Sequence, residues 1–168
     1  MKKVPILVAL SLIVVVLQQA VFSNIKIFGI TFDIVFVYIV CYSLTRNDIE
    51  SIITALFTGV IRDAFFPGVF GVNTIIYIIT AYLAGIVQKK IYRNSIFIPI
   101  VFTMLFTILK DALYFSFMYL INYKPIAFSI VTKVILVEGI SNSIVSIIMY
   151  KLMQKLNRTK LLKEEWKF

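Results

Sequence analysis

The sequence predicts an all-α membrane protein, a bundle of about six transmembrane helices with both termini in the cytoplasm. Its composition is the first indication, because 61% of the 168 residues are hydrophobic and only 15% are charged. A soluble domain carries about 25% charged residues, since its surface faces water. The hydrophobic residues also lie in long runs, and a run of about 18 or more residues can span a bilayer.

We expect one transmembrane domain over residues 1–153 and a basic cytoplasmic tail over residues 154–168. The expected spans within that domain are residues 4–22, 27–44, 49–66, 68–88, 95–120 and 126–153. The first apolar run could instead be a signal peptide. No small-residue cleavage motif follows it, so we interpret it as a span.

Basic residues are distributed unevenly over the links between these spans, and this predicts the orientation. Only Lys26 and Lys124 lie in the links on one side. The other side, with Lys151 at the end of the last expected span included, has twelve: Lys2, Lys3, Arg46, Lys89, Lys90, Arg93, Lys151, Lys155, Arg158, Lys160, Lys163 and Lys167. Links rich in Lys and Arg stay in the cytoplasm, so both termini are expected there. The same distribution explains most of the net charge of +9, and nucleic acid is not an expected partner.

Charged and polar residues inside the expected spans form the candidate functional site. A charge at the bilayer centre costs about 2.5–3.5 kcal/mol on insertion scales, so such residues normally face the bundle interior and pair. The rise of a helix places most of them at a similar height in the outer half of the membrane. The expected cluster of polar and packing residues is Asp33, Gly59, Arg62, Asp63, Gly71, Asn73, Lys110, Asp111, Lys133, Glu138 and Asn142. It could be a set of ion pairs that fixes helix packing, or a polar pocket for a ligand, an ion or a partner helix.

Asp63 lies four residues after Gly59, so the two share one face of a helix. A glycine on that face lets another helix approach closely, which would place Asp63 at the edge of the contact. A buried carboxylate needs a partner, and Lys110 and Lys133 lie at a matching height. We therefore expect an ion pair between Asp63 and one of these two lysines.

Glu138 and Asn142 are also four residues apart and share one face of the last span. A lone carboxylate in mid-membrane could relay protons. No second carboxylate lies at a helical spacing from Glu138 that would support a relay. The sequence therefore favours a hydrogen-bonded structural role for Glu138.

The sequence lacks the residue patterns of common catalytic, cofactor and metal sites. There is no histidine to activate a nucleophile, and Cys41 is the only cysteine, so no Cys/His zinc site is expected. No glycine-rich phosphate-binding loop is present. The expected outer links, residues 23–26, 67 and 121–125, are too short to form a domain. We therefore expect neither enzymatic activity nor a bound cofactor or metal.

A specific order of glycines and polar residues runs from the third expected span to the fourth. Its members are Gly59, Asp63, Gly68, Gly71, Asn73 and the ending Tyr82-Leu83-Ala84-Gly85. Upstream, Gln18 is followed by Phe28-Gly29-Ile30-Thr31-Phe32-Asp33. With the length and the six spans, these motifs resemble the rod shape-determining protein MreD family. The sequence departs from that family where Phe32 replaces a proline, Ser51 and Ala55 replace glycines, and Arg62 replaces an apolar residue.

The resemblance implies a non-enzymatic scaffold of the bacterial cell-wall elongation machinery, located in the cytoplasmic (plasma) membrane as a multi-pass protein. Besides membrane lipids, its implied partner is an MreC-type protein with a single span. Through that protein it would be linked to MreB-type filaments and to peptidoglycan synthases.

The alternative is the substrate-binding subunit of an energy-coupling vitamin transporter, which also has about six spans and a similar length. In that case the polar cluster would bind a ligand. Such subunits show an Ala-x-x-x-Ala face in the first span, whereas Ala9 and Ala20 here are eleven residues apart. The sequence therefore favours the scaffold.

Overall fold

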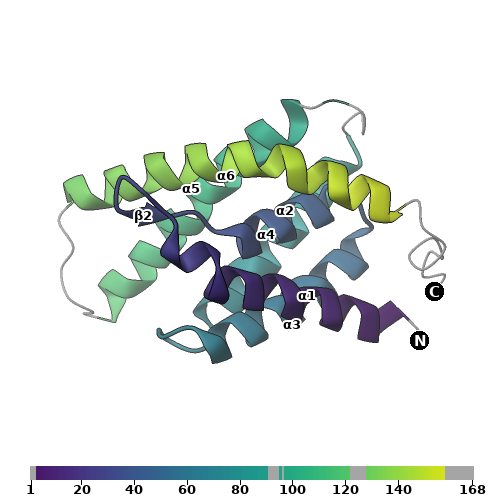
Figure 1. Cartoon of the computed structure of the whole chain (residues 1–168), viewed down its shortest axis with the longest axis horizontal. Helices are drawn as coiled ribbons and strands as arrows, with labels where there is room; N and C mark the ends of the chain where they lie inside the picture. The colour runs from purple at the N-terminus through teal and green to yellow at the C-terminus, as the bar shows by residue number, and fades with distance from the viewer. Residues whose placement is uncertain (1–2, 91–94, 96, 122–127, 158–168) are drawn as a thin grey trace.

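The computed structural model describes residues 3–90, 95, 97–121 and 128–157, and this part of the chain is helical apart from one short hairpin. The elements are α1 (Lys3–Ala20), the 3-10 helix η1 (Phe22–Asn24), β1 (Lys26–Ile27), β2 (Ile30–Thr31), α2 (Ile34–Ser43), α3 (Asp48–Phe65), α4 (Val72–Gln88), α5 (Phe97–Leu120) and α6 (Phe128–Asn157). Helix α1 begins, and helix α6 ends, at the same end of the molecule (Figure 1). The predicted all-helical bundle of six helices is confirmed.

The lengths and composition of these helices are those of a membrane protein. Three described segments are long and apolar enough to cross a bilayer: Val4–Asn24, Phe97–Leu120 and Phe128–Asn157. Helices α2 and α4 are shorter and also apolar. Helix α3 has 18 residues but carries charged side chains near both of its ends. Large apolar side chains such as Ile13, Leu105 and Ile144 are exposed on the outside of the bundle, where lipid would cover them.

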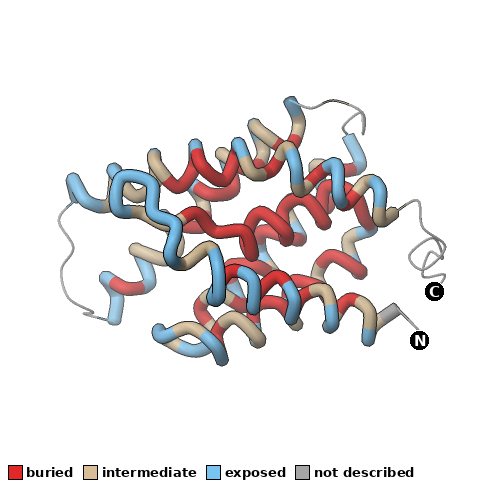
Figure 2. Tube along the Cα trace, in the orientation of Figure 1, coloured by how far each residue is buried: buried red, intermediate tan, exposed pale blue. Residues whose placement is uncertain are grey.

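Helix α2 lies at the centre of the bundle. All ten of its residues are buried, as the continuous red segment in Figure 2 shows. A helix that is apolar on every side is stable only when other helices surround it. Helices α1, α3, α4, α5 and α6 all pack against it. At about 1.5 Å per residue, α2 is only about 15 Å long, roughly half the thickness of a bilayer core.

The expected second span, residues 27–44, is longer than the helix that forms. Its first part is an antiparallel hairpin in which Lys26 pairs with Thr31 and Ile27 pairs with Ile30. The two turn residues, Phe28 and Gly29, have φ angles of 51° and 83°. Two-residue hairpin turns need positive φ angles, and glycine supplies one of them without strain. This turn stops a helix from forming before residue 34.

Other boundaries differ by a few residues from those expected. Helix α4 begins at Val72 rather than at residue 68, because Gly71 adopts a left-handed conformation with a φ of 93°. Helix α6 continues to Asn157, so the first residues of the expected tail, 154–157, are helical. The start of the expected sixth span, residues 126–127, and the rest of the tail, 158–168, lie outside the described residues.

Helices α3 and α4 approach each other closely through two glycines. A Cβ atom built on Gly59 would lie 2.5 Å from the backbone Cα of Thr74. A Cβ atom built on Gly85 would lie 2.8 Å from Oδ1 of Asp48. Gly59 therefore permits the close contact that the sequence led us to expect, and its partner is α4.

Candidate functional site

The site is built around the start of the central helix. Asp33 is the N-cap of α2, and its Oδ1 accepts a hydrogen bond of 3.0 Å from the backbone N–H of Phe36. Its own backbone N–H donates to Oδ1 of Asn142 on α6, at 2.8 Å. A carboxylate at this position satisfies a backbone donor and interacts favourably with the helix dipole.

Gln18 on α1 holds the non-helical backbone that leads into α2. Its Nε2 donates to the carbonyl oxygen of Phe32 at 3.1 Å, and its Oε1 accepts from the N–H of Ile34 at 2.9 Å. Irregular backbone inside a membrane protein must find its hydrogen bonds within the protein. The amides of Gln18 and Asn142 provide three of these bonds around Asp33.

Arg62 of α3 is the first basic partner of Asp33. Its Nη1 lies 2.9 Å from Oδ1 of Asp33. The guanidinium also lies over two aromatic rings, 4.9 Å from the centroid of Phe66 and 5.9 Å from that of Tyr77. Planar guanidinium groups stack on aromatic faces in this way.

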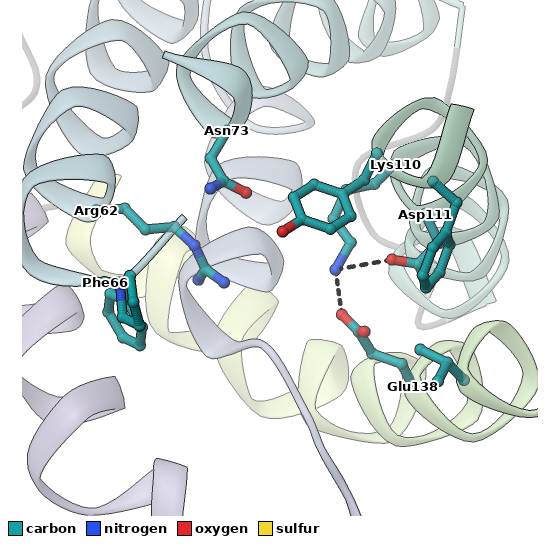
Figure 3. A pocket seen from close by; sticks show the side chains of 10 residues that line it. Arg62, Phe66, Asn73, Lys110, Asp111 and Glu138 are labelled. Atoms are coloured by element: carbon teal, nitrogen blue, oxygen red, sulfur yellow. Dashed lines mark hydrogen bonds and ion pairs between the residues drawn. The ribbon is translucent and has the colours of Figure 1, made fainter. Parts of the chain in front are cut away.

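Lys110 of α5 is the second basic partner and the most highly connected residue of the site. Its Nζ forms ion pairs with Asp33 at 3.6 Å, with Asp111 at 3.1 Å and with Glu138 of α6. Figure 3 shows Lys110 between the last two carboxylates. Glu138 also accepts a hydrogen bond of 3.4 Å from Nδ2 of Asn142, which donates in addition to Oγ1 of Thr107 at 3.2 Å. Glu138 is therefore not the lone carboxylate that the sequence suggested.

We call Asp33, Arg62, Lys110, Asp111 and Glu138 the charged cluster. It contains three carboxylates and two basic groups, so with all five ionised it carries one excess negative charge. The charged side chains are largely buried, with exposed fractions between 6% and 17%. Oδ2 of Asp111 is buried and has no hydrogen-bond partner among the described residues.

A cavity of about 230 Å³ opens beside the charged cluster, between α3, α5 and α6. Its lining is a mixture of charged, amide and aromatic side chains (Figure 3), and consists of Arg62, Phe66, Pro67, Asn73, Lys110, Asp111, Tyr114, Phe115, Val134 and Glu138. Within the described part of the chain, no group of three His, Cys, Asp or Glu side chains is arranged to hold a metal ion.

Asp63 does not pair with a lysine as we expected. Its two carboxylate oxygens accept four hydrogen bonds at the start of α4 instead. The donors are Gly71 N at 3.0 Å, Asn73 Nδ2 at 2.8 Å, Thr74 N at 3.0 Å and Thr74 Oγ1 at 2.7 Å. Backbone N–H groups at a helix N-terminus stabilise a negative charge without a cation. Asp63 is therefore the cap of α4, supplied by the preceding helix.

The structure brings together some of the expected residues and separates others. The charged cluster and Asn142 lie together, and Asn73 connects this site to the cap formed by Asp63 and Gly71. Lys133 is exposed on α6, away from the cavity lining. Gly59 lies between α3 and α4, outside the cavity.

Sequence reasoning gave no structural role to Gln18, Thr74 or Thr107. Each is a polar residue in a mainly apolar helix. For Gln18, this polarity indicates an interior position, because an amide in a membrane span normally faces the bundle interior and finds a hydrogen-bond partner there. The partners of the two threonines depend on the packing of helices far apart in the sequence.

Comparison with known protein families identifies the chain. The model of the rod shape-determining protein MreD family matches residues 2–159. No curated relative and no solved structure matches the chain at a significant level. MreD proteins are non-enzymatic proteins of the cytoplasmic membrane that act in the cell elongation machinery. The alternative family, vitamin transporter subunits, is not the one matched. Since the match covers nearly the whole chain, and the described helices form a membrane bundle, the chain belongs to the MreD family of rod shape-determining proteins.

Proposed function

We propose that the chain is a membrane scaffold that binds an MreC-type single-span protein and thereby links MreB-type filaments to cell-wall synthases. The observation that carries this proposal is the family match over residues 2–159. A membrane-embedded scaffold needs a rigid interior and a lipid-facing surface on which another helix can dock.

The charged cluster supports the first requirement. Its side chains come from the start of α2 and from α3, α5 and α6, and they bind one another across helix boundaries. Ion pairs and hydrogen bonds of this kind restrict how helices can rotate or shift. The cluster therefore holds four helices in one arrangement.

A shallow groove between α5 and α6 supports the second requirement. Its volume is about 450 Å³, and its lining is almost entirely apolar: Ile100, Val101, Met104, Leu105, Ile140, Ser143, Ile144 and Ile147. Gly139 of α6 lets Met104 of α5 pack close behind the groove, because a Cβ atom built on Gly139 would lie 2.7 Å from the sulfur of Met104. We propose this groove as the contact for the single span of the partner.

Co-purification tests the proposed function. Tagged MreC from the same cell should retain the chain in mild detergent. The variant Ile144→Trp places bulk in the groove and should reduce the retained amount. Ile75→Trp is the matched control, because Ile75 is an exposed residue of α4 outside the groove.

Each outcome bears on a separate part of the proposal. Failure of MreC to retain the wild-type chain would contradict the scaffold function itself. Retention of Ile144→Trp at the wild-type level would contradict the groove as the contact while leaving the scaffold function standing.

A further inference from the structure

With all five groups ionised, the charged cluster has one carboxylate more than its two basic groups balance. Arg62 and Lys110 are both already paired with carboxylates. Asp111 is 4% exposed and lines the cavity, and its Oδ2 has no donor among the described residues. An unpaired carboxylate oxygen in a buried site is costly, and a cation beside it removes that cost.

The cavity has room for a molecule rather than for a single ion or water. Its volume of about 230 Å³ far exceeds the ~10–15 Å³ that one water requires on the same measure. A bare metal ion would need a set of closely placed oxygen ligands, and four of the six carboxylate oxygens of the charged cluster are paired with Arg62 or Lys110.

The remaining lining favours an organic cation. Tyr114 and Phe115 line the cavity together with Phe66, whose ring already lies below the guanidinium of Arg62. Aromatic faces attract ammonium groups, most strongly where water is excluded. Asn73 adds an amide that can hydrogen-bond a polar substituent of the same ligand.

The link between α3 and α4 forms one side of the cavity. Phe66 and Pro67 belong to the link between α3 and α4, and Asn73 lies in the first turn of α4. The cavity therefore extends from the charged cluster to the link between α3 and α4. In the predicted six-span topology this link lies at a membrane surface, where amine-bearing lipid headgroups and small soluble amines are both present.

We propose that this cavity binds a primary ammonium group, with Asp111 as its main anionic partner and the aromatic rings around it. The ammonium belongs either to a small soluble amine or to the headgroup of an amine-bearing phospholipid. This site is separate from the groove between α5 and α6, and its occupation does not require MreC.

The test uses the full chain in nanodiscs and has two arms. In the first, radiolabelled ethanolamine is titrated by equilibrium dialysis in discs of phosphatidylcholine and phosphatidylglycerol. In the second, native mass spectrometry compares retained phosphatidylethanolamine with retained phosphatidylcholine, whose trimethylated headgroup cannot donate a hydrogen bond. Saturable ethanolamine binding identifies a soluble amine as ligand, and preferential retention of phosphatidylethanolamine identifies a lipid.

Three variants separate binding from folding. Asp111→Asn removes the excess negative charge, so it should melt at or above the wild-type temperature and bind the amine at least about tenfold more weakly. Val134→Phe fills the cavity and keeps all five charges, and it should also lose binding. Asp48→Asn is the control, because Asp48 pairs with Lys89 outside the cavity and its loss should leave amine binding unchanged.

The proposal fails if the wild-type chain shows neither saturable ethanolamine binding nor a preference for phosphatidylethanolamine. It fails equally if either Asp111→Asn or Val134→Phe folds and retains wild-type binding. Weaker binding in Asp48→Asn, equal to that in Asp111→Asn, would show a general charge effect and would also overturn it.

Discussion

Asp33 and Arg62 join the start of α2 to the last turn of α3 through a single carboxylate oxygen. Oδ1 of Asp33 accepts from the backbone N–H of Phe36 at 3.0 Å and from Nη1 of Arg62 at 2.9 Å. One atom thus serves as a helix cap and as half of an ion pair. A change at Arg62 therefore acts on the central helix as well as on α3.

Asp63→Ala should destabilise the chain because it removes the cap of α4. The substitution leaves two buried donors of Thr74 and a half-buried donor of Asn73 without their acceptor, and each unsatisfied buried donor costs about 1–3 kcal/mol. Asp63→Asn should be milder, because its amide oxygen can still accept from Thr74. The measurement for both variants is the free energy of unfolding in detergent, monitored by circular dichroism. Equal stability of Asp63→Ala and the wild type would contradict the capping role.

Gly59→Ala should force α3 and α4 apart. The added methyl group would lie 2.5 Å from the backbone of Thr74, which cannot move as a flexible side chain could. Overpacking of this kind costs about 1–3 kcal/mol. Gly68→Ala is the matched control, since nothing lies within 4 Å of a Cβ atom built there. The expected result is a lower melting temperature for Gly59→Ala alone, and similar melting of the two variants would refute the close contact.

Reporter fusions test the predicted orientation. Fusions after Lys90 and Arg158 should report a cytoplasmic location, and a fusion after Lys124 an external one. The uneven distribution of basic residues motivates this expectation. The predicted orientation also requires that the hairpin and the short helix α2 together cross the membrane once. A cytoplasmic signal from the fusion at Lys124 would contradict six crossings.

The helical bundle could be predicted from the sequence because long apolar runs depend only on local composition. The non-helical segment before α2 was harder to predict, since residues 27–44 are apolar almost throughout. Only Gly29 and Asp33 indicate a turn and a cap, and the same residues are compatible with the end of a long span. The hydrogen bonds of Gln18 and Asn142, which stabilise the irregular backbone, come from helices distant in sequence.

The sequence predicted which residues lie in the charged cluster better than it predicted which residues pair with one another. Helix rise alone placed Arg62 and Lys110 at a similar height, and both lie in the cluster. Height gives no information about rotation around a helix axis, so Lys133 was expected inside and is exposed. The role of Asp63 was missed because the sequence argument assumed that a buried carboxylate needs a cation, whereas a helix N-terminus also suffices.

A double-mutant cycle on Asp33 and Arg62 tests most directly whether buried charges pair across helices at the start of α2. The variants are Asp33→Asn, Arg62→Met and the double substitution, and the measurement is the free energy of unfolding in detergent. Asp33→Asn leaves the buried Arg62 without its carboxylate and should cost roughly 3–5 kcal/mol. Arg62→Met should cost less, because Asp33 keeps its second basic partner, Lys110, at 3.6 Å. The double variant should be less destabilised than the sum of the two, with a coupling energy of about 0.5–3 kcal/mol. Strictly additive effects would show that the two side chains do not interact and would contradict this account of the site.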